Sequence, residues 1–395
     1  MPASPALLRL LNLAHFSDHY CLLIFPTAVL GLAEAWSLSY AEALSLGTSG
    51  YVAFALATLP AGWLGDRWGR VATLRLFFPG MAVGLVITGL AGDPLQLAVG
   101  MAVLGAAAAL YHPVATALVV QMTAGSGRAL AVNGLWGNLG VAAAALASGL
   151  ATAELGWRWA FLLPAGAMVA SALLYEVVIR RVRSSNAGTE EVRAGLATSI
   201  SGLRRGRVLT LIAISAFFGG LVFSGVTMAF PKLVEERLSA VLPTLGGLGL
   251  VTAAAFAIAA FAQLPVGCLL DRSGARGPLL LATGLQALCL ASLWLLPGPW
   301  SLLLAASAVI LIFAEIPITA WLLARIIQPS WQARAYALQH LLSLGVAAIA
   351  LPLIATLHGT SGNTNSLFGL LALASGTVCL AAAVLLAGRV QPKHA

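Results

Sequence analysis

Long apolar stretches recur along this chain, and they restrict its fold more than any other feature. A helix needs roughly 20 apolar residues to cross the hydrocarbon core of a bilayer. Stretches of that length are separated by short polar segments such as Asp93-Pro94. The sequence predicts twelve transmembrane helices, near 7–31, 41–64, 71–91, 95–122, 129–152, 157–180, 208–231, 241–270, 277–297, 299–325, 333–357 and 365–388.

The composition is consistent with lipid as the solvent of this chain. Of its 395 residues, 60% are hydrophobic and 9% are charged, whereas soluble domains carry about 25% charged residues. The expected fold class is therefore an all-α membrane protein with twelve transmembrane helices. The lipid bilayer is one of its expected partners.

Arginine and lysine residues are unevenly distributed over the connecting segments. If the N-terminus is cytoplasmic, only Arg158, Lys232 and Arg237 fall in outer segments. The inner segments then hold Arg9, Arg67, Arg70, Arg75, Arg128, the run from Arg180 to Arg207, Arg272, Arg276, Arg325, Arg334, Arg389 and Lys393. Because cytoplasmic loops carry the excess of basic residues, we expect a multi-pass protein of the cell (inner) membrane with both termini cytoplasmic. This placement explains the net charge of +8 without a nucleic-acid partner.

One long polar stretch, 181–207, divides the helices into two sets of six. Its basic and small polar residues are typical of a cytoplasmic linker, and an amphipathic helix on the membrane surface is the alternative. We expect an N-terminal six-helix bundle over 1–180 and a C-terminal six-helix bundle over 208–395. The two bundles are expected to be pseudo-symmetric, and the protein is expected to be a monomer.

A short motif occurs at equivalent places in both halves. GWLGDRWGR begins at Gly62, after the second helix, and GCLLDRSGAR begins at Gly267, after the eighth. Glycines permit tight packing of a short turn, and the aspartate can accept hydrogen bonds from a neighbouring helix N-terminus. We expect a conformational latch that forms and breaks as the two halves rock, built from Gly62, Asp66, Arg67, Gly69, Arg70, Gly267, Asp271, Arg272, Gly274 and Arg276.

This duplicated GxxxDRxG loop resembles the signature loop of the major facilitator superfamily. Two further stretches are similar to the superfamily: GWRWAF, which opens the sixth helix at Gly156, and GLWGNLG, which lies in the fifth helix from Gly134. The resemblance covers essentially the whole chain and implies the major facilitator fold, with alternating access to a ligand between the halves. It assigns a helix-packing role to Asn133, Gly137, Asn138 and Gly140 of the fifth helix. The glycine-rich fifth helix also resembles the antiporter motif of the superfamily without its Gly-Pro pair, which favours export.

Three stretches resemble fosmidomycin-resistance-type exporters, which typically have HFxND, FHPE and GGNxG. They are His15 to Asp18 in the first helix, Tyr111-His112-Pro113 in the fourth, and GNLG from Gly137. The chain departs from that pattern at two places. His15 is one residue closer to Asp18, and Val114 replaces the glutamate after His-Pro.

Few ionisable side chains lie within the predicted helices, and such groups are costly and usually functional. Asp18 lies nine residues after Arg9, which is about 14 Å along a helix, and Glu315 lies ten residues before Arg325 on a helix of opposite direction. Both carboxylates are thus expected near the bilayer midplane, one in each half. Carboxylates and histidines at this depth can exchange protons near neutral pH, as proton coupling requires.

In the superfamily, helices 1, 4, 7 and 10 line the central cavity. The resemblance therefore implies that Asp18, His112 and Glu315 face a common space. His15, Asp18 and His19 share one helical face, since they are three and four residues apart. The expected substrate and proton-coupling residues are Asp18, His112, Glu315, His15, His19, Tyr111, Ser224 and Thr227. His340 is expected to be structural.

These features predict a secondary active transporter that exports a small organic compound and is coupled to protons. The alternatives are uptake of a nutrient, or transport of a metal ion or metal complex by the same fold. Histidine and aspartate also suit a metal, but no two ligand motifs converge in the sequence, so no metal ligand and no cofactor are assigned. A membrane enzyme or scaffold is the third class, and the chain has no GxxxxGKS nucleotide loop or HExxH motif. We therefore expect no enzymatic activity and no use of ATP by this chain.

Overall fold

The computed structural model describes residues 4–185, 205–296, 298, 300–328 and 331–387, and these residues form helices and no strand. The first half contains α1 (Pro5–Leu22), α2 (Phe25–Ala35), α3 (Tyr40–Ser45), α4 (Thr48–Arg67), α5 (Arg70–Leu74), α6 (Phe77–Gly89), α7 (Pro94–Ala108), α8 (Tyr111–Thr123), α9 (Gly127–Leu155) and α10 (Trp157–Ser185). The second half contains α11 (Arg205–Ile214), the π-helical segment η1 (Ser215–Gly219), α12 (Gly220–Leu238), α13 (Leu245–Ala260), α14 (Gln263–Ser273), α15 (Arg276–Leu295), α16 (Ser301–Ile326), α17 (Gln332–Ser343), α18 (Ala347–Ser361) and α19 (Asn365–Leu385).

Several of these helices join end to end, and together they make 12 segments long and apolar enough to cross a membrane. The all-helical, twelve-span prediction is therefore confirmed. Predicted and observed ends agree closely, and the largest difference is at the seventh span, which was expected to end at 231 and ends at Leu238. The predicted linker lies largely in 186–204, outside the described residues, so the predicted domain boundaries stay predictions.

Proline explains two of the interruptions within spans. Pro113 has no N–H to donate to the carbonyl four residues earlier, that of Ala109, and the chain breaks between α7 and α8 at this level. Pro26 has the same relation to Leu22, the last residue of α1. Both breaks lie beside histidines, because His19 is close to the end of α1 and His112 is the second residue of α8.

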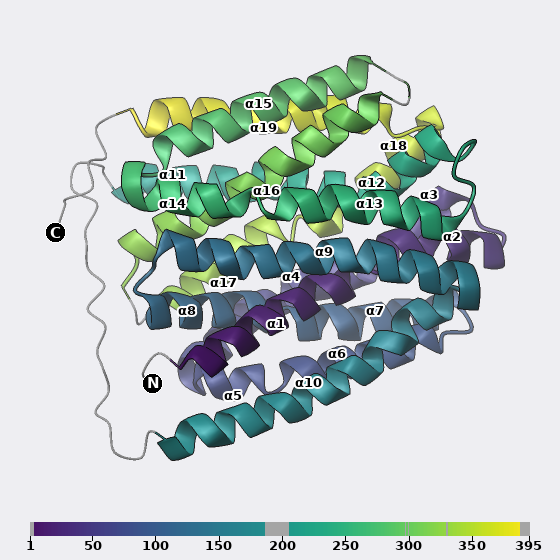
Figure 1. Ribbon diagram of the computed structural model, residues 1–395. Coiled ribbons are helices and arrows are strands. Elements are labelled where there is room, and N and C mark those ends of the chain that lie inside the picture. Colours follow the sequence, from purple (N-terminus) through teal and green to yellow (C-terminus); the bar gives the residue numbers. More distant parts are fainter. Residues whose placement is uncertain (1–3, 186–204, 297, 299, 329–330, 388–395) are drawn as a thin grey trace.

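The helices run roughly parallel to one another, with α1 to α10 mostly on one side and α11 to α19 mostly on the other (Figure 1). Helices from the two halves pack together along their length: α9 against α13 and α14, α4 against α17, and α3 against α18. Within the halves, α1 packs against α9 and α15 packs against α19. The interface between the halves is thus formed at both ends of the molecule.

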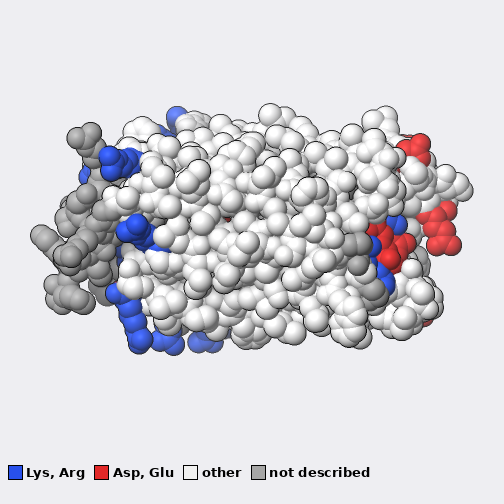
Figure 2. All heavy atoms as spheres, turned by 90° about the horizontal axis from the view of Figure 1, so that it is seen from above, with Lys and Arg blue, Asp and Glu red and all other residues white. Residues whose placement is uncertain are grey.

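Charged residues gather at the two ends of the molecule, and the wide middle band is uncharged (Figure 2). We call one end the basic end, where Arg67, Arg70, Arg128, Arg272 and Arg276 lie, and the other the acidic end, where Glu34, Asp93, Glu154, Glu235 and Glu236 lie. The band between them exposes large apolar side chains such as Leu56 and Leu173. An exposed apolar band of this extent fits a lipid environment.

Candidate functional site

A cavity of about 130 Å³ lies between the two halves, near the middle of the helices. It is lined by α1, α8 and α9 of the first half and by η1, α12, α16 and α17 of the second. The first, fourth, seventh and tenth spans therefore contribute as expected, and the fifth and eleventh add to them. Such a volume accommodates several water molecules or one small ligand.

Three histidines line this cavity on the first-half side. His15 and His19 point to it from α1, and His112 joins them from α8. The ring centroids of His15 and His19 are 4.9 Å apart, and those of His19 and His112 are 5.1 Å apart. His340 of α17 completes the group from the second half, with its ring centroid 4.8 Å from that of His112. The fold thus brings together four histidines that are spread over three spans.

Asp18 lies directly behind His112 and not on the cavity surface. Its side chain is fully buried, and Oδ2 is 2.9 Å from His112 Nε2. Apart from this contact, the carboxylate oxygens have no hydrogen-bond partner among the described residues. The two groups are in contact without an aligned hydrogen bond, and Asp18 offers a proton site beside His112.

A buried polar network holds the neighbouring ring of His15. His15 Nδ1 lies 2.7 Å from the carbonyl oxygen of Asn133, and Asn133 Nδ2 donates to Asn12 Oδ1 at 2.9 Å. The hydroxyl of Tyr111 accepts from Asn133 Nδ2 at 3.2 Å and donates to the carbonyl of Leu11 at 2.9 Å. Because a carbonyl only accepts, His15 donates from Nδ1, and its Nε2 is left as a lone-pair atom.

Glu315 occupies the opposite wall, on α16. Its side chain is 7% exposed, and it forms no hydrogen bond or ion pair with the described residues. The carboxylate lies against η1, since a Cβ on Gly219 would be 2.8 Å from Glu315 Oε1. Short π-helical segments inside α-helices are frequent at functional sites. No lysine or arginine lines the cavity within the described chain.

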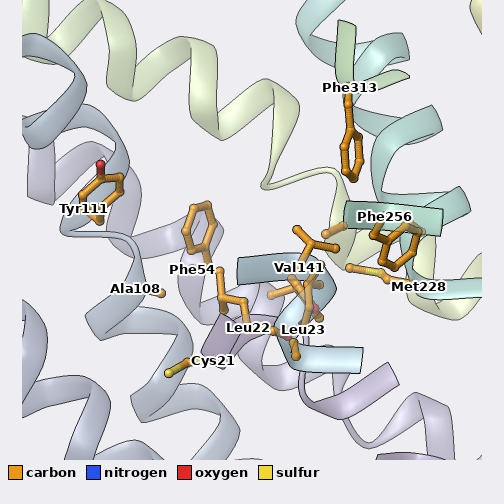
Figure 3. Close-up of a cluster of buried hydrophobic side chains, with 14 of the residues drawn as sticks. Cys21, Leu22, Leu23, Phe54, Ala108, Tyr111, Val141, Met228, Phe256 and Phe313 are labelled. Atoms are coloured by element: carbon orange, nitrogen blue, oxygen red, sulfur yellow. Dashed lines mark hydrogen bonds between the residues drawn. The ribbon is translucent and has the colours of Figure 1, made fainter. Parts of the chain in front are cut away.

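Three other predicted residues lie beside the cavity and not in its wall. Tyr111 stacks on His15 with centroids 5.0 Å apart and acts through the network above. Ser224 lines a second, smaller cavity of about 20 Å³, which Leu22, Leu23 and Met228 also line. These three apolar residues belong to the cluster of buried hydrophobic side chains in Figure 3. Thr227 is buried and donates to the carbonyl of Phe223 in its own helix.

The predicted helix-packing residues of α9 divide into two kinds. Gly137 and Gly140 provide close contact with α1, where a Cβ on Gly137 would be 2.6 Å from His15 Nε2 and one on Gly140 would overlap the carbonyl of Phe16. Asn133 and Asn138 line the cavity as well. Helix α9 therefore both packs closely against α1 and contributes polar side chains to the cavity wall.

At the basic end, Asp271 of α14 joins the second half to the first. Its carboxylate accepts from the backbone N–H of Gly127 at 3.0 Å and of Arg128 at 3.2 Å, at the N-terminus of α9. Trp321 Nε1 donates to the same group at 3.1 Å, and Arg325 lies 3.6 Å away. An anion at a helix N-terminus is favoured by the exposed N–H groups and by the helix dipole.

Asp66, the equivalent residue of the first half, contacts the second half differently. Its Oδ2 is 3.2 Å from Arg334 Nε, at the start of α17. Arg70 donates to the carbonyl of Ala117 and to Gln121 Oε1 in its own half, both at 2.9 Å. The aspartates of the two motif copies thus both contact the other half, with unlike partners.

The glycines of the motif permit close packing or positive φ. Gly62 packs on Ala337 of α17, and Gly267 packs on Gly127 of α9. Gly69 and Gly274 have φ of 92° and 77°, a region that favours glycine. The remaining arginines of the motif, Arg67, Arg272 and Arg276, are exposed.

The acidic end is closed by contact between small residues. A Cβ on Gly249 of α13 would lie 2.6 Å from the carbonyl oxygen of Ala145 on α9, and Gly149 faces Gly249 across the same interface. Nearby, the amine of Lys232 lies 5.1 Å from the ring centroid of Tyr40. The two halves are thus in contact at both ends of the molecule, on either side of the central cavity.

Sequence reasoning missed some of the polar wall. His340 was expected to be structural, and Gln339, Thr319 and Asn133 were not assigned to the cavity, although Gln339 Nε2 donates to Thr319 Oγ1 at 2.8 Å within it. The only sequence signal for a role of His340 in the cavity was its position inside a predicted transmembrane helix. Nothing in the sequence places the eleventh span against the fourth.

Comparisons with known proteins agree with this architecture. A family model described as "Major Facilitator Superfamily" matches residues 11–248. Among solved structures, the xylose transporter XylE from E. coli aligns with a TM-score of 0.72 and 15% identity over 95% of this chain and 96% of that one. FucP, a major facilitator transporter in its outward conformation, aligns at 0.67 and 14% identity over 96% and 98% of the two chains. The human organic anion transporter MFSD10 (TETRAN) aligns at 0.72 and 14% identity over 98% and 100%. No curated protein matches the sequence.

Proposed function

Because this chain belongs to the major facilitator superfamily, a family of multi-pass transporters and not of enzymes, we propose that it exports a small organic compound in exchange for protons. The observation that carries the proposal is a pair of buried carboxylates. Glu315 lines one wall of the cavity, and Asp18 lies behind His112 of the opposite wall. Ionisable groups inside a membrane protein commonly form proton relays.

Proton coupling requires groups that can be protonated from one side of the membrane and deprotonated to the other. Among the described residues, no lysine or arginine forms an ion pair with Glu315 or Asp18, and Asp18 lies against the imidazole of His112. Neither carboxylate is therefore held permanently ionised by an arginine or lysine. If a proton and the substrate replace each other at the cavity wall, proton entry and substrate export are coupled. The solved structure of XylE with a bound sugar is described as a proton:xylose symporter, so the same fold carries proton coupling elsewhere.

Alternating access follows from the two sets of inter-half contacts. The contacts of Asp271 and Asp66 close the basic end, and the contact of Gly149 with Gly249 closes the acidic end. Rocking of the halves about the central cavity would break one set while the other remains. We place the basic end in the cytoplasm, on the positive-inside rule, and the protein in the inner membrane.

The proposed direction rests on sequence resemblance to fosmidomycin-resistance-type exporters. His15, Asp18 and His112, which carry that resemblance, meet at the cavity. Uptake of a nutrient is the competing direction. A deletion strain separates the two, since the internal level of an exported compound rises in it and that of an imported compound falls.

The coupling residue can be tested in proteoliposomes that carry a pH gradient. A thermal-stability screen first identifies a compound that raises the apparent Tm, because a ligand of the native state stabilises it. We expect Glu315→Gln to reduce gradient-driven accumulation of that compound at least tenfold and to retain exchange without a gradient. Asp18→Asn should have the same effect.

The control is Glu176→Gln. Glu176 lies at the basic end, 2.7 Å from Arg75 and away from the cavity. This variant should transport like the wild type. If Glu315→Gln and Asp18→Asn both retain gradient-driven accumulation, the assignment of the coupling residues is wrong.

A further inference from the structure

Four of the six histidines in this chain form one cluster, and proton coupling alone does not require so many. His15, His19, His112 and His340 all face the cavity. One ring nitrogen from each of His15, His19 and His112 lies within 4.8 Å of the others. Imidazole nitrogens grouped at this distance can converge on a single metal ion.

One of these rings, His15, is held in the way that metal-binding histidines usually are, and the ring of His112 lies against a carboxylate. A metal-binding histidine commonly donates its second ring N–H to a backbone carbonyl or a carboxylate, which fixes its orientation. His15 Nδ1 is 2.7 Å from the carbonyl of Asn133, and His112 Nε2 is 2.9 Å from Asp18 Oδ2. The other nitrogen of each ring is then available as a ligand.

The remaining two rings have nitrogens with no protein partner. No hydrogen bond of the His19 ring is found among the described residues, and the ring lies against those of His15, His112 and Phe223. His340 Nε2 is buried and also has no hydrogen-bond partner in the described part of the chain. A buried polar atom without a partner costs free energy, and a metal ion would relieve that cost.

The distances are close to those of a coordinated ion. Metal–nitrogen bonds of about 2.0–2.1 Å in a tetrahedral site place ligand nitrogens about 3.3 Å apart. The observed limit of 4.8 Å among the ligand atoms of His15, His19 and His112 thus requires side-chain shifts of about 1 Å. His340 lies outside this group of three and would approach from the ring of His112, 4.8 Å away between centroids. Such shifts are feasible here because the helix breaks after α1 and before α8 lie beside His19 and His112.

The charges around the cavity also suit a divalent cation. Asp18 and Glu315 are the carboxylates at the site, and no arginine or lysine of the described chain lines it. Two carboxylates would balance the two charges of the ion, which lowers the cost of holding it in a membrane interior. Imidazole nitrogen selects Zn²⁺, Co²⁺, Ni²⁺ or Cu²⁺ over Mg²⁺ and Ca²⁺, which prefer oxygen.

We propose that His15, His19, His112 and His340 bind a divalent transition-metal ion, and that the transported substrate carries this ion. The ion enters either free or in a small organic chelate that leaves coordination positions open to the histidines. The inference rests on the proposed transport function and names the chemistry by which the cavity recognises its substrate. Because His340 belongs to the second half, coordination would also draw the two halves together around the ion.

Binding is tested with Co²⁺ on the full chain, purified without a histidine tag and placed in lipid nanodiscs. We expect one equivalent of Co²⁺ to bind, with visible absorption bands of a nitrogen-coordinated site, and Zn²⁺ to displace it. His19→Ala and His340→Ala should each weaken Co²⁺ binding at least tenfold. In the wild type, Zn²⁺ should raise the apparent Tm, and this rise should disappear in both variants.

The matched control is His358→Ala. His358 is at the acidic end, with Nε2 3.2 Å from Glu236 Oε1, and its removal should leave Co²⁺ binding unchanged. The apparent Tm without metal shows whether each variant is folded. The proposal is overturned if no saturable binding occurs, or if binding survives in the folded double variant with His19→Ala and His340→Ala.

Transport in proteoliposomes distinguishes the source of the ion. One arm supplies Zn²⁺ alone and the other supplies Zn²⁺ complexed with free histidine, and movement in either arm supports the proposal. Metal movement that ignores the pH gradient contradicts proton coupling and leaves the metal inference intact. Gradient-driven transport of a metal-free compound, without Co²⁺ binding, contradicts the metal inference and leaves proton coupling intact.

Discussion

At the scale of single residues, Tyr111 and Tyr40 show how the partners of a buried hydroxyl decide its contribution. The hydroxyl of Tyr111 donates to the carbonyl of Leu11 and accepts from Asn133. The hydroxyl of Tyr40 is also buried and has no hydrogen-bond partner among the described residues. Loss of the first hydroxyl leaves buried groups unsatisfied, whereas loss of the second leaves none.

We expect Tyr111→Phe to lower the free energy of unfolding by about 1–3 kcal/mol, since a buried acceptor loses its donor. It should also weaken Co²⁺ binding, because Asn133 positions His15. Tyr40→Phe should leave both quantities close to the wild type or raise stability slightly. Denaturation in nanodiscs and Co²⁺ titration measure the two effects, and equal losses in both variants would contradict this account of the network.

At the scale of elements, the close approach of α1 to α9 depends on Gly140. A Cβ at this position would overlap the backbone carbonyl of Phe16, which cannot move as a flexible side chain can. Small residues at helix interfaces permit this kind of approach in membranes. Separation of the two helices would also displace His15 and His19, which α1 carries to the cavity.

We expect Gly140→Ala to lower the apparent Tm and to reduce transport, because α1 must move away from α9. Gly166→Ala is the matched control, since no atom lies within 4 Å of a Cβ added to Gly166 on α10. The control should match or exceed the wild type in stability, as alanine is the better helix former. Thermal denaturation of the detergent-solubilised variants measures the two Tm values. An unchanged Tm for Gly140→Ala would refute the close contact.

At the scale of the whole molecule, the contacts at the two ends should have opposite effects on access to the cavity. Asp271→Ala removes the group that joins α14 to the N-terminus of α9 at the basic end. Gly249→Leu places a bulky side chain where a Cβ is already 2.6 Å from Ala145 O, at the acidic end. Asp271→Ala should open the cavity toward the basic end, and Gly249→Leu should open it toward the acidic end.

Access can be measured with a cysteine at the cavity, Ser215→Cys, in a chain without other cysteines. A membrane-impermeant thiol reagent should react faster from the basic side in Asp271→Ala and faster from the acidic side in Gly249→Leu. Asp93→Ala and Gly376→Leu are the controls, because Asp93 caps α7 within its own half and Gly376 has open space around it. Equal acceleration from both sides would argue against two separate closures.

Much of this protein was predictable from local signals in the sequence. Apolar stretches of bilayer length fixed the number and limits of the helices, because lipid cannot hydrogen-bond the backbone and each span must satisfy its own. The repeated GxxxDRxG loop indicated the family, and intramembrane ionisable residues indicated Asp18, His112 and Glu315. Their spacing also predicted that His15 and His19 share one face of α1.

Only the tertiary structure decided which of these residues meet. His112 and His340 are 228 positions apart in the sequence, and their rings are neighbours because the fourth and eleventh spans converge on one cavity. The sequence by itself determined the helices, since each forms from its own backbone and its own contact with lipid. The packing between helices determined the cluster of histidines, the unlike partners of Asp66 and Asp271, and the position of the cavity between the halves. Those contacts depend on the relative placement of twelve spans, which hydropathy does not encode.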